Sequence, residues 1–165
     1  MNRRKFIRQT GATALGAAAV AQTTSSEGKA QTTKPRPKAR SLKRKVQTDQ
    51  APRPVGPYSQ AIIAGNTVYV AGQVPADPKT REAVTGPFED QAVRVFENIK
   101  AIVEAAGASM DNVVRVNVYL ADLGDFRKMN EIYQRYFRED FPVRTTVGAQ
   151  LLSTYKIEVD CIAIK

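Results

Sequence analysis

The sequence predicts an α+β domain in residues 51–165, built as a single β-sheet with two helices on one face. Two observations support this fold class. Segments with the two-residue period of strands alternate with segments that have the 3.6-residue period of helices, in the order ββαβαββ. Both helices are amphipathic, so each must bury one apolar stripe against the sheet.

The first two strands are predicted to form a hairpin. Residues 58–64 and 67–71 are rich in β-prone side chains, and the pair Gly65-Asn66 lies between them. A two-residue turn of this kind joins antiparallel strands.

The first helix is predicted over residues 88–106. Pro87 stands at its start and Gly107 at its end, which are the positions that these residue types favour. The apolar residues of one helical face are Ala92, Val95, Phe96, Ile99, Ile102, Val103 and Ala106.

The second half of the domain contributes three strands and one helix. Strands are predicted at residues 114–120, 145–149 and 156–164, and the second helix at residues 123–137. The sheet face away from the helices would then expose Val, Ile and Tyr side chains. We therefore expect the domain to associate with partner copies.

Alternation in the final strand assigns its side chains to two faces. Ile157, Val159 and Cys161 share one side, and Glu158 and Asp160 point to the other. On this pattern alone, Glu158 is a carboxylate on a solvated face and Cys161 is a small core residue. Arg144 is likewise a surface arginine by default.

Residues 1–21 resemble a signal peptide for export. A basic region at residues 2–8 precedes a short, mildly apolar stretch, and Ala19-Val20-Ala21 offers small residues at the spacing that a signal peptidase accepts. The paired Arg3-Arg4 resembles a twin-arginine (Tat) signal, which exports folded proteins; a Sec signal or a chance pair on a disordered tail are the alternatives. The stretch is too short to span a bilayer, so we expect a periplasmic protein without stable membrane insertion.

The basic charge of the chain lies almost entirely before residue 51. Residues 1–50 hold 12 Lys and Arg against two acidic residues, whereas residues 51–165 hold 13 against 14. Residues 22–50 are predicted to be a basic disordered linker, which either contacts anionic lipid or a polyanion or is simply solvated. The nearly neutral domain argues against nucleic-acid binding.

Several classes of enzyme are excluded by composition. The chain has no histidine and one cysteine, so Ser-His and Cys-His nucleophiles, histidine metal ligands and an intrachain disulfide are all absent. No carboxylate cluster or glycine-rich phosphate loop has suitable spacing. Metal-dependent hydrolases, triad hydrolases and nucleotide-binding proteins are therefore disfavoured.

Residues 51–165 contain a series of short motifs along their whole length: Ala51-Pro52, Gly56-Pro57-Tyr58-Ser59-Gln60-Ala61-Ile62, Val68-Tyr69-Val70-Ala71-Gly72-Gln73, Asn98-Ile99, Ala105-Ala106-Gly107, Val118-Tyr119-Leu120, Asp125-Phe126, Asn130-Glu131-Ile132-Tyr133, Phe141-Pro142-Val143-Arg144-Thr145 and Lys156-Ile157-Glu158-Val159. These motifs resemble, in the same order, those of the reactive-intermediate deaminase family (Rid, RidA or YjgF-type).

The resemblance implies a chorismate-mutase-like fold and a homotrimer, in which the sheets surround a central β-barrel and three clefts lie between neighbouring subunits. It also implies a hydrolase: a deaminase that converts small 2-imino and 2-enamino acids to 2-keto acids and ammonia without a cofactor.

Carried over by resemblance, Arg144 binds the substrate carboxylate, which a planar guanidinium matches through two hydrogen bonds. Glu158 positions the attacking water and moves protons. Tyr58 supplies a ring wall, and the Gly72 backbone supplies a hydrogen bond near the reacting centre.

Asn130 matches a further polar position of the family, although a helix residue that bonds locally explains it equally well. Two positions depart from the family pattern. Ala71 replaces a serine, and Thr146 replaces a cysteine two residues after the arginine. Cys161 is no substitute for that cysteine, because its strand phase turns it away from Glu158.

Two other functions remain open. The same cleft could bind small carboxylate metabolites without catalysis, because the cytoplasmic source of reactive enamines would lie across the membrane. An RNA-directed role, described for some relatives, is disfavoured by the near-neutral domain.

Overall fold

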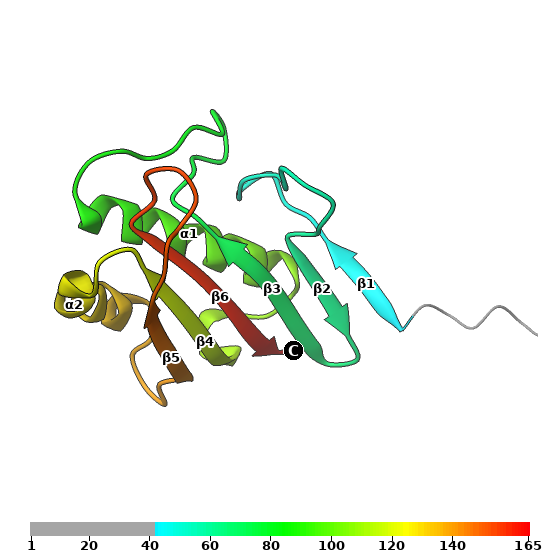
Figure 1. Cartoon of the computed structure of the whole chain (residues 1–165). Helices are drawn as coiled ribbons and strands as arrows, with labels where there is room; N and C mark the ends of the chain where they lie inside the picture. The colour runs from blue at the N-terminus through cyan, green and yellow to red at the C-terminus, as the bar shows by residue number, and fades with distance from the viewer. Residues whose placement is uncertain (1–41) are drawn as a thin grey trace, which may run out of the picture. The chain divides into compact units, whose positions relative to one another are not determined.

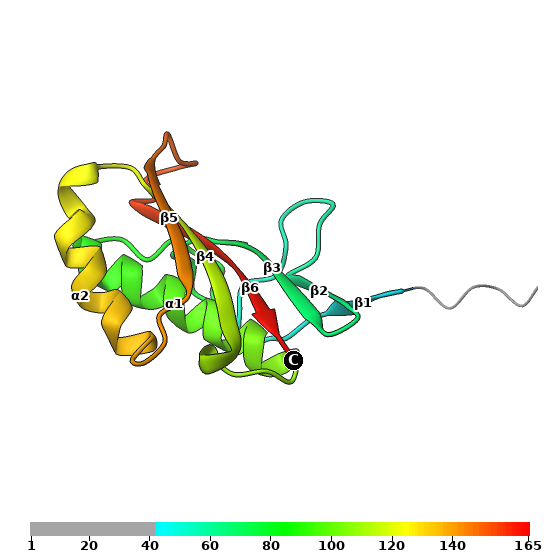
Figure 2. The same cartoon turned by 90° about the horizontal axis from the view of Figure 1, so that it is seen from below.

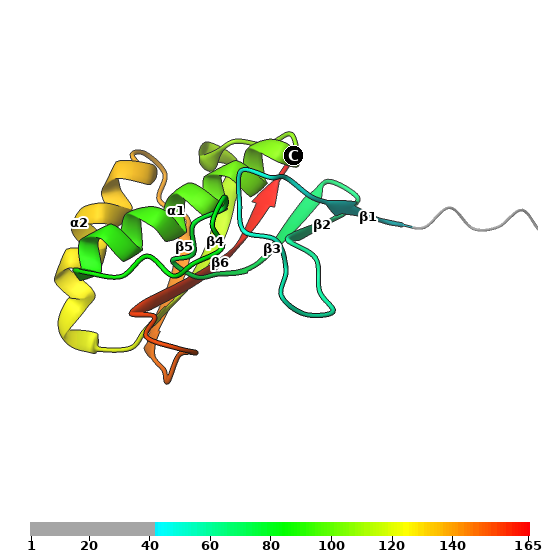
Figure 3. The same cartoon turned by 90° about the horizontal axis from the view of Figure 1, so that it is seen from above.

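Six strands form one sheet, and two helices cover one of its faces. The computed structural model describes residues 42–165, so the predicted signal peptide and the predicted linker up to residue 41 lie outside the described residues. Along the sheet the order is β1-β2-β3-β6-β4-β5. Figures 1, 2 and 3 show both helices on the same side of the sheet. The predicted fold class is therefore confirmed.

The elements lie close to their predicted positions. They are β1 (Lys43–Val46), β2 (Ala61–Ala64), β3 (Thr67–Gln73), α1 (Phe88–Ala105), β4 (Val113–Leu120), α2 (Phe126–Tyr136), β5 (Val143–Gly148) and β6 (Ile157–Ile164), with short 3₁₀ turns at Met110–Asn112 and Leu123–Asp125. Only β4 and β5 pair in parallel; the other strand pairs of the described sheet are antiparallel.

Strand β1 extends the sheet beyond the predicted domain boundary. Lys43–Val46 pairs with β2, and Val46 is buried. The chain then wraps around the buried side chain of Gln60, which donates to the carbonyl oxygens of Thr48, Ala51 and Pro52 at 2.9–3.0 Å. The prediction of a disordered linker up to residue 50 is therefore wrong for residues 43–50.

Helix α1 buries the whole of its predicted apolar face. Each of the seven predicted residues is at most 1% exposed. Pro87 caps the start of the helix, and Gly107 follows its end with φ 83°, a conformation that favours glycine. Helix α2 begins at Phe126 and not at residue 123, because the preceding residues form a 3₁₀ turn.

The two faces of the sheet differ as predicted. Toward the helices, Ile157, Val159 and Cys161 of β6 are at most 1% exposed. The other face, which we call the open face, carries polar residues and large apolar side chains that are 41–69% exposed. These are Tyr69, Val114, Val143, Val147 and Ile164.

Candidate functional site

One cavity brings together three of the predicted site residues. It has a volume of about 560 Å³ and is lined by Glu158 from β6, Gly72 from β3 and Tyr58 from the loop before β2. That loop and the loop between β5 and β6 both extend from the sheet on the side away from the helices (Figure 3). The loop between β5 and β6 contributes three further residues to the lining of this cavity, Leu152, Ser153 and Tyr155, which were not predicted as site residues.

The Glu158 carboxylate lies directly over the backbone of Gly72. A Cβ atom at position 72 would collide with Oε1 of Glu158 and would lie 3.1 Å from its Cδ. The register of β3 against β6 shifts between Val70 and Gln73, so Gly72 sits in a bulge. Glycine leaves the space that the Glu158 carboxylate occupies, beside a partly buried stretch of peptide backbone.

The surroundings of Glu158 suit a proton acceptor. Burial raises the pKa of its carboxyl group, and the neighbouring Asp160 carboxylate adds to the effect. Asp160 is held on the open face, where it accepts hydrogen bonds from Nδ2 of Asn117 at 2.9 Å and from the hydroxyl of Tyr119 at 3.1 Å. A carboxyl group whose pKa is raised toward neutrality can both accept and return a proton.

Arg144 lies on the other side of the sheet. It pairs with Val116 of β4, which also pairs with the buried Cys161. Its guanidinium contacts helix α2, with Nη1 3.7 Å from Sδ of Met129. A second cavity, of about 340 Å³, is lined by Arg144 and the predicted Asn130.

Thr146 shares the Arg144 side of β5. Its hydroxyl oxygen is buried and has no hydrogen-bond partner within residues 42–165. The six predicted residues therefore divide into two groups of three. Arg144, Thr146 and Asn130 lie on the helix side, whereas Glu158, Gly72 and Tyr58 line the other cavity. A single chain does not bring the two groups together.

Cys161 belongs to neither group. Its side chain is buried in the core, and burial, followed by the charge of Asp160, raises the pKa of its thiol to about 12. The prediction that Cys161 faces away from Glu158 is confirmed, because adjacent strand positions point to opposite faces.

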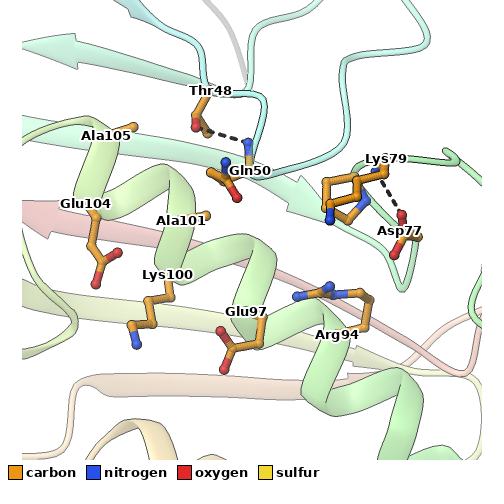
Figure 4. A pocket seen from close by; sticks show the side chains of 11 residues that line it. Thr48, Gln50, Asp77, Lys79, Arg94, Glu97, Lys100, Ala101, Glu104 and Ala105 are labelled. Carbon is orange, nitrogen blue, oxygen red and sulfur yellow. Dashed lines mark hydrogen bonds between the residues drawn. The ribbon is translucent and has the colours of Figure 1, made fainter.

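A further cavity, of about 590 Å³, lies between α1 and the loops that carry Gln50 and Asp77, and none of the predicted residues lines it (Figure 4). Charges of both signs alternate along this helix, from Arg94 and Glu97 to Lys100 and Glu104. Glu97 accepts a hydrogen bond from the Tyr136 hydroxyl at 2.8 Å. This is the pattern of a solvated helix face.

Within the described part of the chain, no three His, Cys, Asp or Glu side chains group together as metal ligands would. No helix in that part combines the length and the apolar character needed to cross a bilayer.

A sequence profile of the family described as Endoribonuclease L-PSP matches residues 48–165. The chain belongs to this family, that of the RidA or YjgF-type proteins, which confirms the resemblance seen in the motifs. A RutC family protein of Pyrococcus horikoshii is 52% identical over 125 residues, which are 75% of this chain and 99% of that protein.

Relatives with a more specific name are also similar. A protein of Dermatophagoides farinae named 2-iminobutanoate/2-iminopropanoate deaminase is 45% identical over 125 residues, or 75% of this chain and 98% of that protein. The crystal structure of RidA from the Antarctic bacterium Psychrobacter sp. aligns with a TM-score of 0.71 at 46% identity, covering 74% of this chain and 99% of that one.

Proposed function

We propose that the protein hydrolyses reactive 2-imino acids and their 2-enamino tautomers to 2-keto acids and ammonia. The observation that carries this proposal is a pair of complementary groups. The Arg144 guanidinium has no acidic partner in the described residues, and the Glu158 carboxyl group, whose pKa is raised, lies over the backbone of Gly72. Membership of the family and the deaminase name of a 45% identical relative support it.

The complete site forms between two copies of the chain in a homotrimer. One copy supplies Arg144, Thr146 and Asn130, and its neighbour supplies Glu158, Gly72 and Tyr58. Two features support this arrangement: the groups lie on opposite sides of one sheet, and the open face exposes apolar side chains that a partner would cover.

The chemistry follows from the two groups. Arg144 holds the substrate carboxylate through two hydrogen bonds, which orients the imine carbon toward Glu158. Glu158 takes a proton from a water molecule while the water oxygen adds to the imine carbon. Glu158 then delivers this proton to the imine nitrogen. Transfer of the hydroxyl proton of the resulting carbinolamine to its nitrogen then breaks the C–N bond, which releases ammonia and leaves the 2-keto acid. The Thr146 hydroxyl lies on the same face of β5 as Arg144 and has no hydrogen-bond partner in the described chain, but its oxygen is buried there.

Non-catalytic binding of a small carboxylate metabolite is the second candidate. It is favoured by the two departures from the family pattern, Ala71 and Thr146, both of which border the proposed site. An RNA-directed role remains disfavoured, because residues 51–165 carry 13 basic residues against 14 acidic ones.

We also propose that residues 1–21 direct export to the periplasm through the twin-arginine route. Fusion of residues 1–30 to a folded reporter tests this proposal. Export that depends on Arg3 and Arg4 supports it, and retention in the cytoplasm contradicts it.

The activity is tested by following keto-acid release from imines that an amino-acid oxidase generates in situ, with semicarbazide trapping the surviving imine. The wild-type protein should accelerate release, and Arg144→Ala and Glu158→Ala should each lower kcat/KM by at least about 100-fold. Absence of acceleration with small, aliphatic and aromatic imines, together with saturable carboxylate binding, would favour the binding function.

A further inference from the structure

The guanidinium of Arg144 packs against two aromatic rings of α2. Its Cζ lies 4.6 Å from the ring centroid of Tyr133 and 5.8 Å from that of Phe126. These residues lie one helical turn on either side of Met129, whose sulfur contacts Nη1. The same face of α2 therefore presents two rings and a thioether to one arginine.

This packing leaves the N–H groups of Arg144 available. Within residues 42–165 the guanidinium forms no ion pair and donates no hydrogen bond to an oxygen atom; its one donor contact is to the sulfur of Met129. An acidic partner would occupy the same N–H groups that a substrate carboxylate needs. An aromatic face attracts the cation through its π-system and does not compete for those groups.

The ring of Tyr133 is itself fixed in place. It is 3% exposed and packs against Phe96, Phe137 and Phe141, with ring centroids 5.8, 4.4 and 6.5 Å away. Its hydroxyl is buried without a partner in the described chain, and burial raises its pKa to about 12 although Arg144 opposes the shift. The phenol therefore stays neutral and does not cancel the charge of Arg144.

We propose that Tyr133 and Phe126 are positioning residues that set the plane of the Arg144 guanidinium for two-point recognition of the substrate carboxylate. This inference rests on the proposed function, in which Arg144 is the carboxylate-binding group. Neither ring needs to touch the reacting atoms. Their contribution is to hold a flexible arginine in one orientation before substrate arrives, which lowers the entropy lost on binding.

The test is calorimetric binding of 2-oxobutanoate, a stable 2-keto acid, to the full chain and its variants, alongside steady-state kinetics. Phe126→Leu keeps the apolar bulk but removes a ring, and it should raise Kd and KM about three- to tenfold while kcat stays within about twofold. Phe126 is 44% exposed, so this variant should fold. Tyr133→Phe keeps the ring and should bind as the wild type does.

Phe88→Leu is the matched control, because it removes a buried ring that makes no ring contact with Tyr133 and does not pack on Arg144 in the described residues. It should lower the melting temperature and leave Kd unchanged. A second readout is the ¹H shift of the Arg144 Nε–H group, assigned by its absence in Arg144→Lys. The shift should change in Phe126→Leu and stay unchanged in Phe88→Leu.

The outcomes separate this inference from the proposed function. Normal 2-oxobutanoate binding by Phe126→Leu, with binding lost in Arg144→Ala, would overturn the positioning role and leave the deaminase intact. Weaker binding by Phe126→Leu in a protein that hydrolyses no imine would support the positioning role and reject the deaminase. If the wild type binds no 2-oxobutanoate, both are rejected.

Discussion

The two faces of the sheet carry different groups of the predicted site residues. The helix side buries the apolar core and presents, on its edge strand β5, an arginine held by aromatic rings. The open face carries two neighbouring carboxylates, Glu158 and Asp160, among exposed apolar side chains. Because successive side chains of a strand point to opposite faces, neither the arginine nor the carboxylates can reach the face that carries the other. A single folded chain therefore keeps the two groups of predicted site residues apart, on opposite sides of its sheet.

The largest loss of kcat/KM is expected from a substitution at Gly72, which lies against the Glu158 carboxylate. Gly72→Ala places a methyl group where the carboxylate lies, so kcat/KM should fall at least about 100-fold. The matched control is Gly56→Ala, whose added Cβ would make ordinary 3.5 Å contacts with the Tyr58 ring. The kcat/KM of this variant should stay within about threefold of the wild-type value. Equal activity of both variants in the keto-acid assay would contradict the close carboxylate–backbone contact.

A smaller effect, on the pH dependence of kcat/KM, is expected from removal of the Asp160 carboxylate. The proposed mechanism requires ionised Glu158, and the pKa of this group is raised, so kcat/KM should fall with decreasing pH at values above the ordinary pKa of 4.5. Asp160→Asn removes a negative neighbour and should move this acid limb to lower pH. Profiles of kcat/KM against pH for the wild type and for Asp160→Asn measure the acid limb and its shift. If the acid limb of Asp160→Asn matches that of the wild type, the titration belongs to a group other than Glu158.

The smallest effect concerns stability. Because the pKa of Glu158 is higher in the folded than in the unfolded chain, its contribution to stability is fully present below the unfolded pKa and is lost as pH rises through the folded value. Glu158→Gln should therefore raise the melting temperature at pH 7 by about 1–2 °C, and the gain should vanish near pH 4. A gain that is independent of pH would point to packing and not to charge.

Most of the fold could be predicted from the sequence, because its elements have clear periods. The apolar face of α1 and the alternation of β6 were both assigned to the correct residues. Strand β1 was missed because Lys43, Arg44 and Lys45 are exposed on an edge strand and only Val46 is buried. A charged edge strand has the composition of a linker.

The division of the site could not be predicted in the same way. In β5 the apolar residues Val143 and Val147 face the open side, whereas Arg144 and Thr146 face the helices. This reverses the usual rule that apolar strand residues face the core. The individual residues were identified by motif, but their placement on opposite sides depends on the pairing of β5 with β4.

The central claim, that each site joins the two halves from different copies, is tested most directly by subunit mixing. Arg144→Ala and Glu158→Ala chains, co-expressed with different tags and purified as mixed trimers, should each be inactive alone and together regain about one third of wild-type activity, because every mixed trimer has one intact interface of its three. Mixing Glu158→Ala with Gly72→Ala damages the same half in both chains and should restore nothing. Activity in the first mixture that is no greater than in the second would contradict a site shared between subunits.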